Sequence, residues 1–122
     1  MNILGIHSSY TALSHDPSAS LMVDGRVVAA IEEERLNRIK TSSAFFPYNA
    51  IRECLDISGL SIEDIDVVVS DGSTYPILKD KIKKSLLHLF GYSPKIELVN
   101  HAYSHVAGAF LSSGYNDSLV VS

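Results

Sequence analysis

A two-residue turn between two extended segments is the feature that most constrains the fold of this chain. Residues 18–23 and 26–32 both have the pattern of a β-strand, and Asp24-Gly25 joins them. An Asp-Gly pair readily adopts the backbone angles of a tight hairpin turn, so the two segments are expected to pair antiparallel. Residues 2–8 form a preceding apolar segment, interrupted by Gly5, which predicts a buried strand beside this hairpin.

After the hairpin the chain alternates between helical and extended patterns. We expect helices at 47–59, 77–90 and 101–114, strands at 65–70 and 95–99, a single helical turn at 61–64, and the start of another strand at 117–122. Three antiparallel strands followed by crossover units predict an α/β protein with a mixed sheet and helices on both faces. One domain over residues 1–122 is expected. Because an unpaired apolar strand is an aggregation hazard, we also expect the chain to be a piece of something longer.

Charge and cysteine content exclude several classes of partner. The formal net charge is -4, without a basic stripe, so neither nucleic acid nor an anionic membrane surface is an expected partner. The single Cys54 falls on the apolar side of a predicted helix, where it is expected to pack, and no disulfide can form within the chain. With no leader and no apolar run of about 20 residues, the expected location is the cytoplasm.

Two histidines stand four positions apart where a strand is expected to pass into a helix. On a helix this spacing places the rings of His101 and His105 on one face, so both can reach one cation. The positive end of the helix dipole disfavours an imidazolium at His101. A chance pair among five histidines is the alternative interpretation. Even as ligands, the two rings form half of a metal site, because a third protein ligand is usual.

Three other polar features each allow two interpretations. The charged run from Glu32 to Lys40 is either a solvated helical turn or the rim of a cleft, where Arg35, Arg38 and Lys40 would face an anionic ligand. His15 is either a turn residue bonded to the backbone or a site residue. Asp71, at a strand end, suits ordinary turn chemistry as well as a functional loop.

Five segments together resemble a known family. They are Ile3-Leu-Gly-Ile6, His15-Asp-Pro-Ser-Ala-Ser-Leu-Met-Val-Asp-Gly25, the run 26–40 with its Glu-Glu-Glu-Arg, Phe46-Pro47, and His101-Ala-Tyr-Ser-His105-Val-Ala-Gly-Ala-Phe110. In this order they resemble the amino-terminal region of the O-carbamoyltransferases of nodulation-factor and antibiotic biosynthesis. The resemblance covers nearly every residue. It implies that the chain is the amino-terminal fragment of a larger carbamoyltransferase catalytic domain, which has an actin-like (ribonuclease H-like) fold and is related to the tRNA threonylcarbamoyl-transfer proteins.

The resemblance also implies a reaction and roles for four residues. Members of that family use ATP and carbamoyl phosphate to make carbamoyl-adenylate in a second domain, and then move the carbamoyl group to a hydroxyl of a sugar or natural product. A divalent metal, iron or magnesium, holds the nucleotide intermediate. By analogy His101 and His105 resemble the metal ligands, His101 also a nucleotide contact, His15 the general base, and Lys40 a contact to the activated carbamoyl group.

The implied partners are therefore the remainder of the same polypeptide and a small-molecule acceptor. Two other classes remain open. An actin-like ATPase or kinase would share the fold, although the region around His15 lacks a glycine-rich phosphate loop. A non-catalytic fragment or interaction module is the other alternative, and loss of carbamoyl transfer on substitution of His15 would distinguish it from an enzyme.

Overall fold

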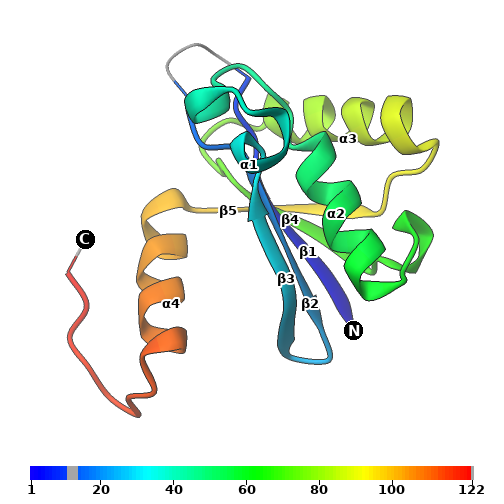
Figure 1. Cartoon of the computed structure of the whole chain (residues 1–122). Coiled ribbons are helices and arrows are strands. Elements are labelled where there is room, and N and C mark those ends of the chain that lie inside the picture. Colours follow the sequence, from blue (N-terminus) through cyan, green and yellow to red (C-terminus); the bar gives the residue numbers. More distant parts are fainter. Residues whose placement is uncertain (11–13, 122) are drawn as a thin grey trace.

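Strand β1 (Asn2–His7) lies at the centre of a five-stranded mixed sheet in the computed structural model, which describes residues 1–10 and 14–121. The other strands are β2 (Ser18–Val23), β3 (Arg26–Glu32), β4 (Val67–Asp71) and β5 (Lys95–Val99), and the order across the sheet is β3-β2-β1-β4-β5 (Figure 1). The pairs β1–β2 and β2–β3 are antiparallel, whereas β1–β4 and β4–β5 are parallel. The predicted mixed sheet is therefore confirmed.

Helices α2 (Tyr48–Ser58) and α3 (Ile77–Phe90) cover one face of this sheet. The other helical segments are α1 (Glu34–Asn37), η1 (Lys40–Ser42), η2 (Ile62–Asp64) and α4 (His101–Ser113). Leu4, Leu21 and Val68 point from the strands into one core, which Ile51 of α2 and Leu86 of α3 complete; all five are fully buried. Since side chains alternate along a strand, the neighbouring residues of β1, β2 and β4 belong to the opposite face.

Most element bounds follow the sequence signals. The hairpin turns at Asp24 and Gly25, both with positive φ, and α3 ends at Gly91 in the left-handed conformation. Pro47 is the N-cap of α2 rather than its first helical residue, and Ser61 forms the predicted capping box with Asp64. Among the described residues, no helix is long and apolar enough to cross a membrane.

The charged run after β3 is not the uniformly solvated helix turn of one interpretation. Glu33 is only 2% exposed, and its carboxylate accepts hydrogen bonds from Asn49 Nδ2 at 2.7 Å and from the Ala50 backbone N–H at 2.8 Å. It thus satisfies donors in the first turn of α2, which otherwise lack partners. Charge alone could not identify this residue, because its neighbours in the run are more exposed.

Two loops pack together beyond the ends of the central strands. Ala44 N–H donates to Ser9 Oγ at 2.8 Å, and Asp16 N–H donates to the Thr41 carbonyl at 2.8 Å. Thr41, with φ of 59°, holds a left-handed conformation that is unfavourable for a β-branched side chain. The loop that carries His15 is therefore anchored on a strained neighbouring segment.

Helix α4 departs from the sequence expectation in its packing, though not in its bounds. It extends away from the sheet and from α2 and α3 (Figure 1), and none of its residues is buried, so the apolar stripe of Ala102, Val106 and Phe110 has no core to join. Residues 117–121 form no strand, and the prediction of a strand there was wrong for the part of it that is described. A strand requires a hydrogen-bonded neighbour, which this segment does not have among the described residues.

Candidate functional site

A cleft of about 1320 Å³ lies over the sheet face that α2 and α3 leave uncovered. Its floor includes Gly5, Ser20 and Ala30, small residues in register across three adjacent strands. One end is formed where β1, β4 and β5 finish, since parallel strands bring their carboxyl ends to the same edge. The other described lining residues are Ile6, His7, Ser8, Ser14, His15, Asp16, Ser18, Ala19, Ile31, Glu32, Arg35, Val69, Ser70, Asp71, Gly72, Thr74, Tyr75, Leu78, Val99, His101, Ser104 and His105.

Asp71, the last residue of β4, joins two histidines from different elements. Its Oδ1 atom lies 2.8 Å from His7 Nδ1 and its Oδ2 atom lies 2.7 Å from His101 Nδ1. These contacts, the one with His7 first, lower the pKa of Asp71 to about 2 against the opposing effect of burial. The carboxylate is therefore ionised at neutral pH, and both of its oxygens are engaged. Of the two interpretations of Asp71, the geometry favours the functional one.

His7 was not singled out by the sequence, which placed it in a buried strand. His7 is the last residue of β1, which pairs with β4. The Nε2 atom of its ring lies 3.0 Å from the His15 carbonyl oxygen. The hydrogen bond to Asp71 raises the pKa of His7 above its usual value, although partial burial acts in the other direction. The parallel pairing of β1 with β4 could have indicated it, because Ile6 pairs with Ser70 and the next residue of each strand is then a neighbour of the other.

His101 and His105 lie on the first turns of α4, as their spacing predicts. Asn100 caps this helix, since its side chain accepts from the Tyr103 backbone N–H. Asp71 holds His101 Nδ1, so Nε2 is the atom that faces His105, whose own Nε2 lies 3.1 Å away. Two nitrogens bound about 2.0–2.1 Å from one metal ion would be separated by roughly 2.9–3.4 Å.

The separation is compatible with one divalent ion, and it is also that of a hydrogen bond between the two rings, so the pair supplies at most half of a ligand shell. Among residues 1–10 and 14–121, no three His, Cys, Asp or Glu side chains converge on a common point suitable for a metal. Asp71 contacts the back of His101 rather than the atom that faces His105. It occupies the position of an outer carboxylate, which fixes the tautomer and orientation of a ligating imidazole.

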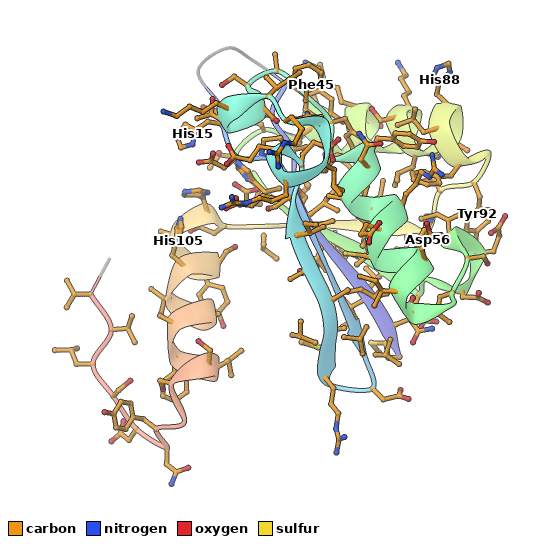
Figure 2. The ribbon with its side chains drawn as sticks, viewed as in Figure 1. His15, Phe45, Asp56, His88, Tyr92 and His105 are labelled. Carbon is orange, nitrogen blue, oxygen red and sulfur yellow. The ribbon has the colours of Figure 1, made fainter. Side chains whose placement is uncertain are left out.

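His15 lines the same cleft from the loop before β2. In Figure 2 its side chain lies on the same side of the molecule as His105, whereas His88 lies at the far end of α3. Its Nδ1 atom is 2.7 Å from Asp16 Oδ2, and because a carboxylate only accepts, Nδ1 carries the hydrogen in this arrangement. The Nε2 atom of this tautomer can accept a hydrogen bond, and no described residue is seen to donate one to it. Residues 11–13 of the predicted polar loop lie outside the described part of the chain.

The basic residues of the charged run take different positions. Arg35 lines the cleft and pairs weakly with Glu32 at 3.6 Å, which agrees with the rim interpretation. Lys40 is exposed in η1 and is not among the described residues that line the cleft. Its predicted contact to an activated carbamoyl group stays a prediction. It is nevertheless joined to the His15 loop through the backbone of the next residue, Thr41.

Two hydroxyl groups at this end of the sheet have unused hydrogen-bonding capacity. Ser8 Oγ and Ser70 Oγ are buried, and neither has a partner among the described residues. Both residues border the cleft. Ser70 has the same parity along β4 as Val68, so its hydroxyl belongs to the core face, and these two groups are not counted among the candidate ligand contacts.

Comparison with known sequences finds one matching family model and several similar proteins. The family model described as "Carbamoyltransferase N-terminus" matches residues 2–88. The Nodulation protein NolNO of Sinorhizobium fredii is 34% identical over an alignment of 129 residues. The alignment covers 88% of this chain and 19% of that protein. The Uncharacterized protein sll1178 of Synechocystis sp. is 43% identical over 68 residues, covering 56% of this chain and 10% of that protein. The chain thus spans about a fifth or less of the length of these two relatives.

A solved structure supports the fold. YeaZ from Pseudomonas aeruginosa superposes with a TM-score of 0.61 at 16% sequence identity, over 93% of this chain and 50% of that one. At this identity the likeness concerns architecture alone. Together with the strand order, it identifies the fold as actin-like, as expected from the sequence.

Proposed function

Because this chain belongs to the carbamoyltransferase amino-terminal family, we propose that the protein carrying it transfers a carbamoyl group to a hydroxyl of a small-molecule acceptor. One observation supports this proposal most directly. His15 and the His101–His105 pair border a single cleft, so a proton acceptor and a candidate metal-binding pair are available to the same bound molecule.

His15 is the proposed general base. An alcohol is a poor nucleophile near neutral pH, and removal of its proton in the transition state typically contributes 10²–10⁴-fold. Asp16 holds the Nδ1 hydrogen, so Nε2 is the atom that would accept this proton. The arrangement has the same logic as the carboxylate–imidazole pair of hydrolytic triads, in which the carboxylate fixes the tautomer.

The proposed step is a substitution at the carbamoyl carbon. The acceptor oxygen forms a bond to this carbon while its proton passes to His15 Nε2. The bond between the carbon and a phosphate oxygen of carbamoyl-adenylate breaks, and its electron pair leaves with the adenylate. Carbamoyl-adenylate would be made from ATP and carbamoyl phosphate elsewhere in the same polypeptide. Lys40 is proposed to contact the activated carbamoyl group, although it is not among the described residues that line the cleft.

His101 and His105 are the residues that would hold a divalent ion, and His101 would also lie next to the nucleotide. Between the two metals suggested by the resemblance, two imidazole ligands favour iron, because magnesium prefers oxygen ligands. When bound, such an ion would neutralise charge on the phosphate of the nucleotide. Further ligands from outside this chain or from the nucleotide would complete the shell.

The test uses the full-length protein with ATP, carbamoyl phosphate, ferrous ion and a panel of sugar and natural-product alcohols. Mass spectrometry of the products should detect an acceptor heavier by one carbamoyl group. The His15→Ala variant should lower kcat by about 10²–10⁴-fold. His88→Ala is the matched control, since His88 is an exposed histidine of α3 outside the cleft lining.

Absence of a carbamoylated product across the panel would count against the transferase proposal. Product formation by His15→Ala at the wild-type rate would instead remove the base assignment while leaving the reaction in place. ATP hydrolysis to ADP without carbamoyl transfer would favour an actin-like ATPase.

A further inference from the structure

The side chain of His7 lies between Asp71, at the end of β4, and the loop that carries His15. It projects from the end of β1, is 33% exposed, and makes one contact with each of them. Its Nδ1 atom is 2.8 Å from Asp71 Oδ1, and Asp71 in turn holds His101. Its Nε2 atom is 3.0 Å from the backbone carbonyl of His15. His7 is thus a direct link between the loop of the proposed base and the carboxylate behind the proposed metal ligand.

The chemistry of its two partners determines what His7 must provide. A carboxylate oxygen and a carbonyl oxygen only accept hydrogen bonds, so making both bonds requires a hydrogen on each ring nitrogen. In this arrangement His7 is therefore a doubly protonated imidazolium. Charge-assisted hydrogen bonds of this kind are shorter and stronger than neutral ones, which suits a group that must fix the relative position of two elements.

The loop of His15 is held at three consecutive residues, but only one of these bonds leads to the histidine pair. Ser9 Oγ donates to the Ser14 carbonyl at 2.6 Å, and Asp16 N–H donates to the Thr41 carbonyl. Both of those bonds lie within the two loops that pack together beyond the ends of the central strands. The bond from His7 to the His15 carbonyl instead leads through Asp71 to α4.

We propose that His7 is a positioning residue that sets the placement of the His15 loop relative to the His101–His105 pair. It acts through Asp71 on one side and through the backbone of His15 on the other, without touching the reacting groups. This inference rests on the proposed function, because it assigns His15 and the histidine pair to one reaction. It predicts that either bond, removed singly, impairs turnover.

Two amide substitutions separate the two bonds. His7→Asn keeps a donor near the position of Nδ1 and can still reach Asp71, whereas His7→Gln keeps a donor near the position of Nε2 and can still reach the His15 carbonyl. Losing one charge-assisted bond should lower kcat by about 10–100-fold in either variant. The metal affinity should fall by about 10-fold in His7→Gln alone, since only this variant removes the bond to Asp71 Oδ1 that helps to fix the carboxylate behind His101. His88→Asn and His88→Gln are the matched controls.

Both variants are measured in the full-length protein for kcat, KM of the acceptor, ferrous-ion affinity and melting temperature. Lowered kcat with unchanged acceptor KM, and a metal affinity that differs between the two variants, would support the inference. Wild-type kcat and metal affinity in both would overturn it. Failure of the proposed function looks different, because the wild-type protein itself would then form no carbamoylated product.

Nitrogen NMR of the wild-type protein provides a readout that does not depend on the stability of the variants or on activity. With ¹⁵N-labelled histidine at neutral pH, both ring nitrogens of His7 should show the chemical shifts of protonated nitrogen. One protonated and one unprotonated nitrogen would mean that one of the two bonds is not made, and the positioning role would be rejected.

Discussion

The Glu33 carboxylate accepts a hydrogen bond from the Ala50 backbone N–H at 2.8 Å, so the residue that follows β3 provides an acceptor for the first turn of α2, 17 positions along the chain. Asn49 contributes a second bond to the same carboxylate. This buried contact joins the helix that covers the sheet to the strand at its edge.

Replacement of Glu33 by alanine should therefore lower the free energy of unfolding by about 2–3 kcal/mol, because it leaves buried donors without a partner. Urea denaturation measures this difference. Glu63→Ala, at an exposed glutamate, is the control and should change stability by less than about 0.5 kcal/mol. Equal small losses in the two variants would contradict the capping role of Glu33.

The left-handed backbone of Thr41 predicts a stabilising substitution. Thr41→Gly should raise the free energy of unfolding by about 0.5–1 kcal/mol, because the relief of strain outweighs the greater freedom of glycine in the unfolded chain. Thr74→Gly is the matched control, since Thr74 is an exposed threonine without a positive φ, and it should be slightly destabilising. If both variants lost stability equally, the strain assigned to Thr41 would not exist.

The contact between His7 and Asp71 predicts a stability maximum in mildly acidic solution for the metal-free protein. Asp71 has a lowered pKa, so its contribution is present above its ordinary value of 3.8 and is lost as pH falls toward 2. His7 has a raised pKa, so its contribution is complete below 6.5 and is lost as pH rises through its higher folded-state value. The pair should thus stabilise the protein most between about pH 4 and 6.5.

Urea denaturation of the wild-type protein and of Asp71→Asn at pH 3, 5 and 8, with chelator present, measures this effect. The difference between the two proteins should be largest at pH 5, on the order of 1 kcal/mol. A difference independent of pH would show that the two side chains do not interact as ions.

Metal content provides a separate test of the histidine pair. In the full-length protein, His105→Ala should lower the affinity for ferrous ion by at least about 10-fold, because it removes one of two imidazole ligands. Elemental analysis after dialysis against a fixed concentration of the ion gives the occupancy. Unchanged occupancy, equal to that of His88→Ala, would remove His105 from the metal site.

Local signals predicted most of the architecture. The Asp24-Gly25 turn and the glycines that follow each long helix fix backbone conformation within a few residues, so the hairpin and the bounds of α3 and α4 could be predicted closely. The apolar stripe of α4 was misleading, since hydrophobic periodicity indicates that a face needs a partner but not that the partner is present.

The site depended more on contacts distant in sequence. His101 and His105 could be paired because four residues on a helix fix their separation. His7 and Asp71 are 64 positions apart, and only the parallel register of β1 with β4 brings them together. Glu33 was hidden for a related reason, because its burial depends on where α2 packs.

The central place of β1 has a consequence for synthesis. As the ribosome extends the chain, β1, β2 and β3 can associate once about the first 32 residues have emerged, since their pairing is local in sequence. His7 must then wait for β4 to dock beside it, and for α4 to follow, before its neighbourhood is complete. Nascent protein would accordingly form its first strand pairs well ahead of the complete core and of any capacity to bind ligand.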